Sequence, residues 1–143
     1  FAGMSPRYIL DTDHISLFQR GHPQVMTRVH TTPPAELAVS IISAGEQLQG
    51  RLAVIRRART QADVARGFAR LRETLDFYQT QTVVDYGEDA AKQFDALRAQ
   101  GVRIGTQDLQ IAAIALTTLA TVVTRNRRHF EQVPGLAIED WTT

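Results

Sequence analysis

The 143-residue sequence contains no cysteine, a single tryptophan and, at Lys92, a single lysine among its sixteen basic residues. The absence of cysteine excludes disulfide bonds and metal sites built from thiolates. No apolar run approaches the roughly 20 residues that a membrane-spanning helix needs, and no segment resembles a signal peptide. A net charge of +1 is too small to indicate nucleic-acid binding by itself. We therefore expect a soluble cytoplasmic protein with no membrane partner.

The composition suits one folded unit. With 43% hydrophobic residues, a chain of this length can bury a core of its own. No repeat, low-complexity segment or shift in composition divides it, so we expect a single domain over residues 4–143. The three residues before Met4 look like a cloning remnant and are left out of that domain.

The stretch Tyr8-Ile9-Leu10-Asp11 is central to the interpretation. Three apolar or aromatic residues without alternation predict a strand buried on both faces, as in a parallel sheet. Asp11 then stands at the carboxyl end of that strand, the edge where open α/β sheets bind ligands. A carboxylate at the tip of a buried strand is costly unless a cation lies beside it. The stretch therefore predicts a metal ligand at Asp11.

Strands and helices alternate along the rest of the chain. Further strands are predicted at residues 37–41, 82–85, 120–124 and 136–138. Helices are predicted from 15 to about 21, from 22 to 33, from a capping box at 43–46 to 59, and at 61–78, 88–98, 108–119 and 125–132. This order predicts an α/β fold, with helices on both faces of a mostly parallel sheet of four to five strands.

The two helices between residues 46 and 78 form a predicted hairpin. Apolar residues recur along each of them at helical spacing, most regularly Val64, Phe68, Leu71, Leu75 and Tyr78. Beyond Glu46, the hairpin carries seven arginines against three acids. We expect a basic exposed side and an apolar flank that can receive an amphipathic helix from another chain.

Three acids occupy comparable places in the predicted fold. Asp11 ends the first strand, Glu46 is predicted in the first turn of a helix after the second, and Asp108 opens the nearly uncharged helix before the fourth. Each can be explained singly as a helix-capping or helix-dipole residue. Together they can meet at one sheet edge, where clustered carboxylates need a cation to stay ionised. Such oxygen-only sites suit Mg²⁺ or Mn²⁺ and support in-line phosphodiester cleavage.

Four segments of the chain resemble the PIN-domain ribonucleases, most closely the VapC-type toxins of bacterial toxin–antitoxin pairs. They are residues 10–16 (LDTDHIS), 40–48 (SIISAGEQL), 105–113 (GTQDLQIAA) and 123–141 (VTRNRRHFEQVPGLAIEDW). The resemblance covers residues 8–141. It implies a three-layer α/β/α sandwich, Mg²⁺- or Mn²⁺-dependent cleavage of RNA, homodimerisation and a small cognate antitoxin partner. The matching positions imply metal-site roles for Asp11, Glu46 and Asp108, and supporting polar roles for Thr12, Thr124 and Asn126.

The segment after the fourth strand departs from the family pattern. Where the family commonly has a further acid before the aromatic residue, this chain has His129. His129 is a candidate metal ligand, and the alternatives are a solvated loop histidine or a site that needs only three acids. The neighbouring arginines Arg125, Arg127 and Arg128 are candidates for holding RNA phosphates. The remaining histidines, His14 among them, show no zinc spacing and are interpreted as structural or exposed.

Two other interpretations compete with the nuclease. Asp11-Thr12-Asp13 also resembles the opening motif of the haloacid-dehalogenase phosphatases, in which Asp11 would be the nucleophile. That chemistry needs a lysine and an acidic pair after a later strand, whereas Lys92 lies mid-helix and Thr124 is followed by arginine and asparagine. The other competitor is a degenerate, non-catalytic PIN domain that only binds a partner, which His129 suggests.

Overall fold

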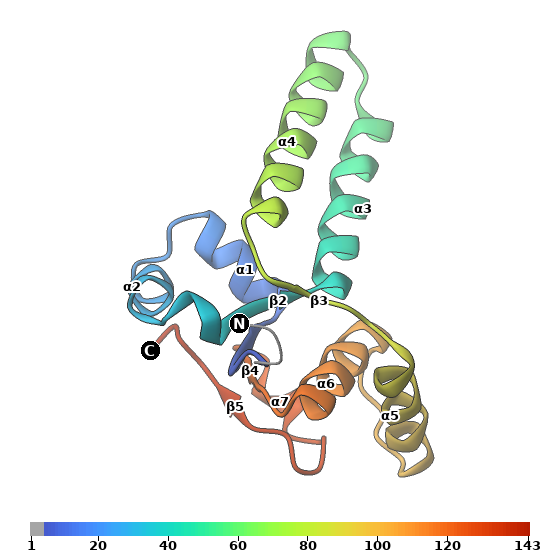
Figure 1. Cartoon of the computed structure of the whole chain (residues 1–143). Coiled ribbons are helices and arrows are strands. Elements are labelled where there is room, and N and C mark those ends of the chain that lie inside the picture. Colours follow the sequence, from blue (N-terminus) through green and yellow to red (C-terminus); the bar gives the residue numbers. More distant parts are fainter. Residues whose placement is uncertain (1–4) are drawn as a thin grey trace.

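Five short strands make one sheet in the computed structural model, which describes residues 5–143 (Figure 1). The proposed cloning remnant lies outside the described residues. The strands are β1 (Tyr8–Leu10), β2 (Leu37–Ser40), β3 (Val83–Val84), β4 (Thr121–Val123) and β5 (Ile138–Glu139). All pair in parallel, in the order β3-β2-β1-β4-β5. The predicted α/β fold with a parallel sheet is confirmed.

Helices connect the strands in every crossover. They are α1 (Thr12–Gln19), α2 (Pro23–Thr31), α3 (Ile41–Arg57), α4 (Gln61–Gln79), α5 (Glu88–Ala99), α6 (Thr106–Thr118) and α7 (Arg127–Phe130), with a single 3₁₀ turn, η1 (Pro34–Glu36), before β2. The predicted stop after α5 is also correct, because Gly101 has a φ of +93°, which only glycine adopts without strain. Within residues 5–143, no helix is both long and apolar enough to cross a membrane.

The alternation of side chains along β1 divides the core into two layers. Ile9 packs in a cluster with residues of α5 and α6, such as Leu97 and Ile111. Tyr8 and Leu10 belong to a second cluster, which includes residues of α1 and α2. All three β1 side chains are buried, as expected for a central strand covered on both faces.

Helices α3 and α4 form a long antiparallel hairpin that extends away from the sheet (Figure 1). The hairpin was predicted, but the apolar stripe on α4 is not wholly enclosed, because Phe68 is 53% and Leu75 41% exposed. The contact between the two helices includes a glycine and a hydrogen bond. Gly67 packs directly against Ile55, and Arg51 donates from Nε to the buried Thr74 hydroxyl at 2.9 Å.

The start of α3 corrects one prediction. The helix begins at Ile41, and its N-cap is Ser40, whose hydroxyl accepts a hydrogen bond from the Ser43 backbone N–H at 3.1 Å. Ser43 is therefore not the cap, and β2 ends before Ile41. Both serines have suitable cap chemistry, but β2 ends at Ser40, which selects the earlier one. Glu46 consequently lies in the second turn of α3, where it is not engaged in a capping box.

Candidate functional site

A pocket of about 420 Å³ opens at the carboxyl ends of β1 and β4. Its lining residues are Asp11, Thr12, Asp13, Glu46, Asp108, Arg125 and Asn126. The three acids predicted to converge therefore do surround one pocket, although they come from the end of β1, the second turn of α3 and the first turn of α6. The sheet order places β1 between β2 and β4, so the crossovers diverge at this edge and leave it open.

Asp11 serves both the fold and the pocket. Its backbone N–H donates to the Val123 carbonyl at 3.0 Å, which continues the β1–β4 pairing. Its Oδ1 accepts the backbone N–H of His14 at 2.8 Å and so caps α1. The residue is only 5% exposed, yet it lines the pocket. The capping and metal-ligand interpretations are therefore compatible, because the cap uses one oxygen.

Thr12 holds Glu46 in place. Its hydroxyl donates to Glu46 Oε1 at 2.7 Å and lies 2.8 Å from the hydroxyl of Ser43. Burial raises the pKa of the Glu46 carboxyl, and the nearby charges of Asp108 and Asp11 raise it further, while the bond from Thr12 lowers it. Burial is the largest of these effects and the neighbouring acids add to it, so a cation in the pocket would favour the ionised carboxylate.

Asn126 connects Asp108 to His129. Its side-chain amide nitrogen lies 3.3 Å from Asp108 Oδ2 and 2.8 Å from His129 Nδ1, so its two hydrogens can serve both acceptors. The buried Thr124 hydroxyl accepts the backbone N–H of Asn126 at 2.8 Å and fixes the start of this turn. His129 Nδ1 is 3.2 Å from Asp108 Oδ2. The supporting polar residues predicted from sequence thus lie where they can orient the acids.

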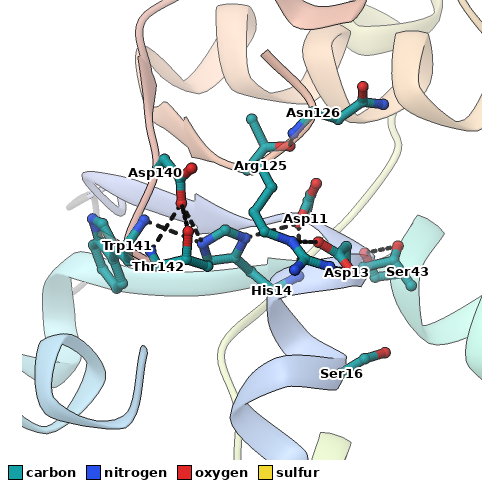
Figure 2. Close-up of polar contacts among 12 residues, drawn as sticks. Asp11, Asp13, His14, Ser16, Ser43, Arg125, Asn126, Asp140, Trp141 and Thr142 are labelled. Atoms are coloured by element: carbon teal, nitrogen blue, oxygen red, sulfur yellow. Dashed lines mark hydrogen bonds and ion pairs between the residues drawn. The ribbon is translucent and has the colours of Figure 1, made fainter. Parts of the chain in front are cut away.

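Arg125 forms a two-bond ion pair with Asp13 at the rim of the pocket. Its Nε donates to Asp13 Oδ2 at 2.8 Å and its terminal nitrogen to Oδ1 at 2.9 Å (Figure 2). These bonds raise the pKa of the Arg125 guanidinium. The other two candidate arginines are exposed on α7, where Arg127 pairs with Glu131 at 3.2 Å. The Arg125–Asp13 pair was not predicted, although both residues follow neighbouring strands.

Asp11 belongs to a second group of potential ligands, with Asp13 and His14. One ligand atom from each lies within 4.8 Å of the others, and no other three such residues among those described, Asp11, Glu46 and Asp108 included, come as close. The group is poorly suited to a cation, however. Both oxygens of Asp13 are engaged by Arg125, and the His14 side chain is completely buried and does not line the pocket.

The pocket carboxylates have a common feature that fits a metal. Oδ1 of Asp11, Oε1 of Glu46 and Oδ2 of Asp108 accept hydrogen bonds from the protein. The second oxygen of each accepts none from residues 5–143, so three carboxylate oxygens remain available. Hard divalent cations such as Mg²⁺ and Mn²⁺ prefer such ligands. The donor set is therefore of the chemical kind that a divalent cation takes.

Known proteins with similar sequences and structures identify the family. No family model matches the chain. The chain is 30% identical over 135 residues to the tRNA(fMet)-specific endonuclease VapC of Salmonella typhimurium, an alignment that covers 94% of this chain and 98% of that protein. It is 29% identical over 139 residues to ribonuclease VapC1 of Haemophilus influenzae strain R2866, with the same coverage.

A solved structure gives the same answer. The crystal structure of DNA-bound VapBC from Salmonella typhimurium contains a chain that superposes with a TM-score of 0.76 at 27% identity, covering 95% of this chain and 98% of that chain. The fold is that of a PIN-type α/β protein. The chain belongs to the VapC family of ribonucleases, and the resemblance predicted from its motifs is confirmed.

Proposed function

We propose that this protein is a metal-dependent endoribonuclease and the toxin component of a toxin–antitoxin pair. The observation that carries the proposal is the pocket in which Asp11, Glu46 and Asp108 each keep one carboxylate oxygen free of protein hydrogen bonds. Family membership supports ribonuclease chemistry, and the phosphatase and degenerate-domain alternatives are not favoured. Lys92, which a phosphatase would require at its site, is exposed on α5.

The residues of the pocket have separate roles in this proposal. Asp11, Glu46 and Asp108 would hold Mg²⁺ or Mn²⁺, with His129 as a further candidate ligand. A cation bound there activates water and neutralises charge on the phosphodiester. Thr12 orients Glu46, and Asn126 orients Asp108 from a turn that Thr124 fixes. Arg125 keeps further N–H groups beyond those given to Asp13, and with Arg127 and Arg128 it would hold RNA phosphates.

The substrate and partners follow from the family and the surface. The Salmonella relative is named as a tRNA(fMet)-specific endonuclease, so that tRNA is the first substrate to test. Proteins recognise RNA sequence more easily in the unpaired loop bases of a tRNA than in its duplex segments. Solved relatives are VapBC complexes, which supports a small antitoxin as partner. The α3–α4 hairpin offers exposed Leu52, Val54, Phe68 and Leu75 for such a contact. A homodimer, measurable by sedimentation, is also expected.

The test is cleavage of tRNA(fMet) by purified protein with Mg²⁺, Mn²⁺ or excess EDTA. Asp11→Asn and Asp108→Asn should each lower the rate by more than about 100-fold, since even residues that only support metal ligands contribute about 10–100-fold. Asparagine still caps a helix, so α1 should be retained in Asp11→Asn. Asp95→Asn, an exposed acid on α5, is the matched control. Full activity in EDTA, or in either site variant, would refute the metal mechanism.

A further inference from the structure

His14 is a buried ionisable residue to which the proposed chemistry assigns no role. Its side chain is completely buried, and its Nδ1 is the one buried side-chain nitrogen or oxygen without a hydrogen-bond partner in residues 5–143. The ring lies between Asp11 on one side and the segment of Asp140 and Trp141 on the other (Figure 2). Buried polar atoms rarely lack a partner, so the surroundings of this nitrogen are informative.

The environment of Nε2 determines which ring nitrogen carries the proton. The backbone N–H of Trp141 donates to His14 Nε2 at 3.2 Å, so Nε2 presents a lone pair. Asp140 Oδ1 is 3.7 Å from the same nitrogen, but it already accepts two hydrogen bonds from Thr142, at 2.8 and 2.6 Å. It does not need a proton from the ring. In a neutral imidazole the hydrogen must therefore be on Nδ1.

The Nδ1–H group faces the carboxylate of Asp11. Nδ1 is 3.6 Å from Asp11 Oδ1, which is longer than a hydrogen bond but close enough for electrostatic attraction inside a buried region. The same oxygen accepts the backbone N–H of His14 at 2.8 Å. Both groups of His14 thus act on Oδ1, and Oδ2 of this pocket-lining residue accepts no hydrogen bond from residues 5–143.

We infer that His14 is a positioning residue, which orients Asp11 so that Oδ2 is presented to the metal. The inference rests on the proposed function. The ring is held in turn by Trp141, whose indole is fully buried, packs edge-to-face on Tyr8 at 5.2 Å and lies 4.6 Å from the Arg28 guanidinium. Supporting groups behind metal ligands commonly contribute about 10–100-fold to metal affinity.

Three substitutions separate the two contacts of the ring. His14→Asn keeps an N–H donor near the position of Nδ1 but cannot reach Trp141. His14→Gln keeps an acceptor near the position of Nε2 but has no donor at Nδ1. His14→Leu fills similar space and makes neither contact. Val25→Ala is the control for lost packing, because Val25 is fully buried in the core cluster that contains Tyr8 and Trp141 and does not line the pocket.

The experiment measures the Kd for Mn²⁺ by calorimetry and the Tm in EDTA for the wild type and these four variants. His14→Gln and His14→Leu should bind Mn²⁺ about tenfold or more weakly, while His14→Asn should remain within about threefold of wild type by keeping the donor. Val25→Ala should lower Tm without changing the Kd. Across these variants, the Kd for Mn²⁺ should then depend on whether a donor is present at the position of Nδ1, and not on the Tm of the variant.

Several outcomes would overturn the inference. Equal Mn²⁺ affinity in wild type and His14→Leu, with RNA cleavage intact in the wild type, would refute the inference alone. So would an affinity in His14→Asn as low as in His14→Leu. Electron spin-echo spectra of bound Mn²⁺ give a further test. If they show coupling to a nitrogen, and this coupling disappears in His14→Asn, the ring is itself a metal ligand and not a positioning residue. Wild-type protein that binds no Mn²⁺ would refute the proposed function and the inference together.

Discussion

Glu46 is the residue whose ionisation the pocket disfavours most clearly. Burial and the charges of Asp108 and Asp11 raise its pKa above the ordinary value of 4.5. Above pH 4.5 the unfolded chain releases this proton, whereas the folded chain retains it until the raised pKa is reached. The folded state binds more protons in that window, so its free energy of unfolding falls as the pH rises through it.

Glu46→Gln should therefore remove this pH dependence. In EDTA, the Tm of the variant should decline less than that of the wild type between pH 4.5 and neutrality. Mn²⁺ should stabilise the wild type at neutral pH and leave the variant nearly unchanged, because binding to the folded state alone adds stability. The measurement is thermal unfolding across this pH range. Parallel curves for the two proteins in EDTA would show that Glu46 is not strained in the empty pocket.

His129 offers a test of metal preference. Imidazole is a poor ligand for Mg²⁺ but an acceptable one for Mn²⁺, and His129 Nδ1 lies 3.2 Å from Asp108 Oδ2. His129→Asp supplies a carboxylate instead and should raise Mg²⁺-supported cleavage relative to Mn²⁺ by about tenfold. The assay is a metal titration of cleavage rate at one pH, with His129→Ala as control. An unchanged Mg²⁺-to-Mn²⁺ ratio would identify His129 as a bystander.

At the scale of elements, Gly67 determines how closely α4 approaches α3 at Ile55. A Cβ on Gly67 would lie 2.6 Å from Ile55 Cγ1, whereas a Cβ on Gly50 in α3 would meet nothing within 4 Å. Overpacking at position 67 lowers the free energy of unfolding by about 1–3 kcal/mol. The higher helix propensity of alanine relative to glycine offsets about 1 kcal/mol of this loss.

Gly67→Ala should accordingly destabilise the protein by about 1 kcal/mol net, and Gly50→Ala should stabilise it by about 0.5–1 kcal/mol. Denaturant unfolding measures both, and RNA cleavage should be unaffected because neither residue lines the acidic pocket. Ile55→Ala in the Gly67→Ala background should recover part of the loss. Equal stabilisation by both alanines would mean that the hairpin adjusts freely at Ile55.

The elements differ in how far their sequences determine them. The buried strand at residues 8–10 and the acids at its edge were predictable, because an apolar run without alternation that ends in a carboxylate is typical of a central parallel strand. The choice between Ser40 and Ser43 as the cap of α3 was not predictable from sequence. Both serines have suitable cap chemistry, and the point at which β2 ends determines which of them caps the helix. The role of His14 depends on Trp141, 127 residues away, and no local pattern connects them.

At the scale of the whole molecule, the expected antitoxin complex can be tested through charge. Arg59 is exposed at the tip of the hairpin, and Arg66 makes only an exposed pair with Asp63, which contributes about 0–1 kcal/mol. Replacing both arginines with glutamate should leave Tm nearly unchanged. It should weaken antitoxin binding by about tenfold, because acidic groups on the antitoxin would then face negative instead of positive charges.

Arg103→Glu, exposed between α5 and α6, is the matched control for that experiment. The antitoxin to test is the product of any small reading frame found directly upstream of this gene, and calorimetry gives its affinity. Equal affinity for wild type and the double reversal would place the antitoxin surface away from the tip of the hairpin.

The central position of β1 determines when the pocket can exist. Its two neighbours are β2, made soon after it, and β4, which begins at Thr121. A chain leaving the ribosome therefore carries Asp11 and Glu46 long before it carries Asp108, Asn126 and the Trp141 that holds His14. Because synthesis proceeds from the N-terminus, the nascent protein passes most of its time beside ribosomal and transfer RNA without an assembled site. Under the proposed function, translation itself delays the first cut until the segment from Asp108 to Trp141 has been made.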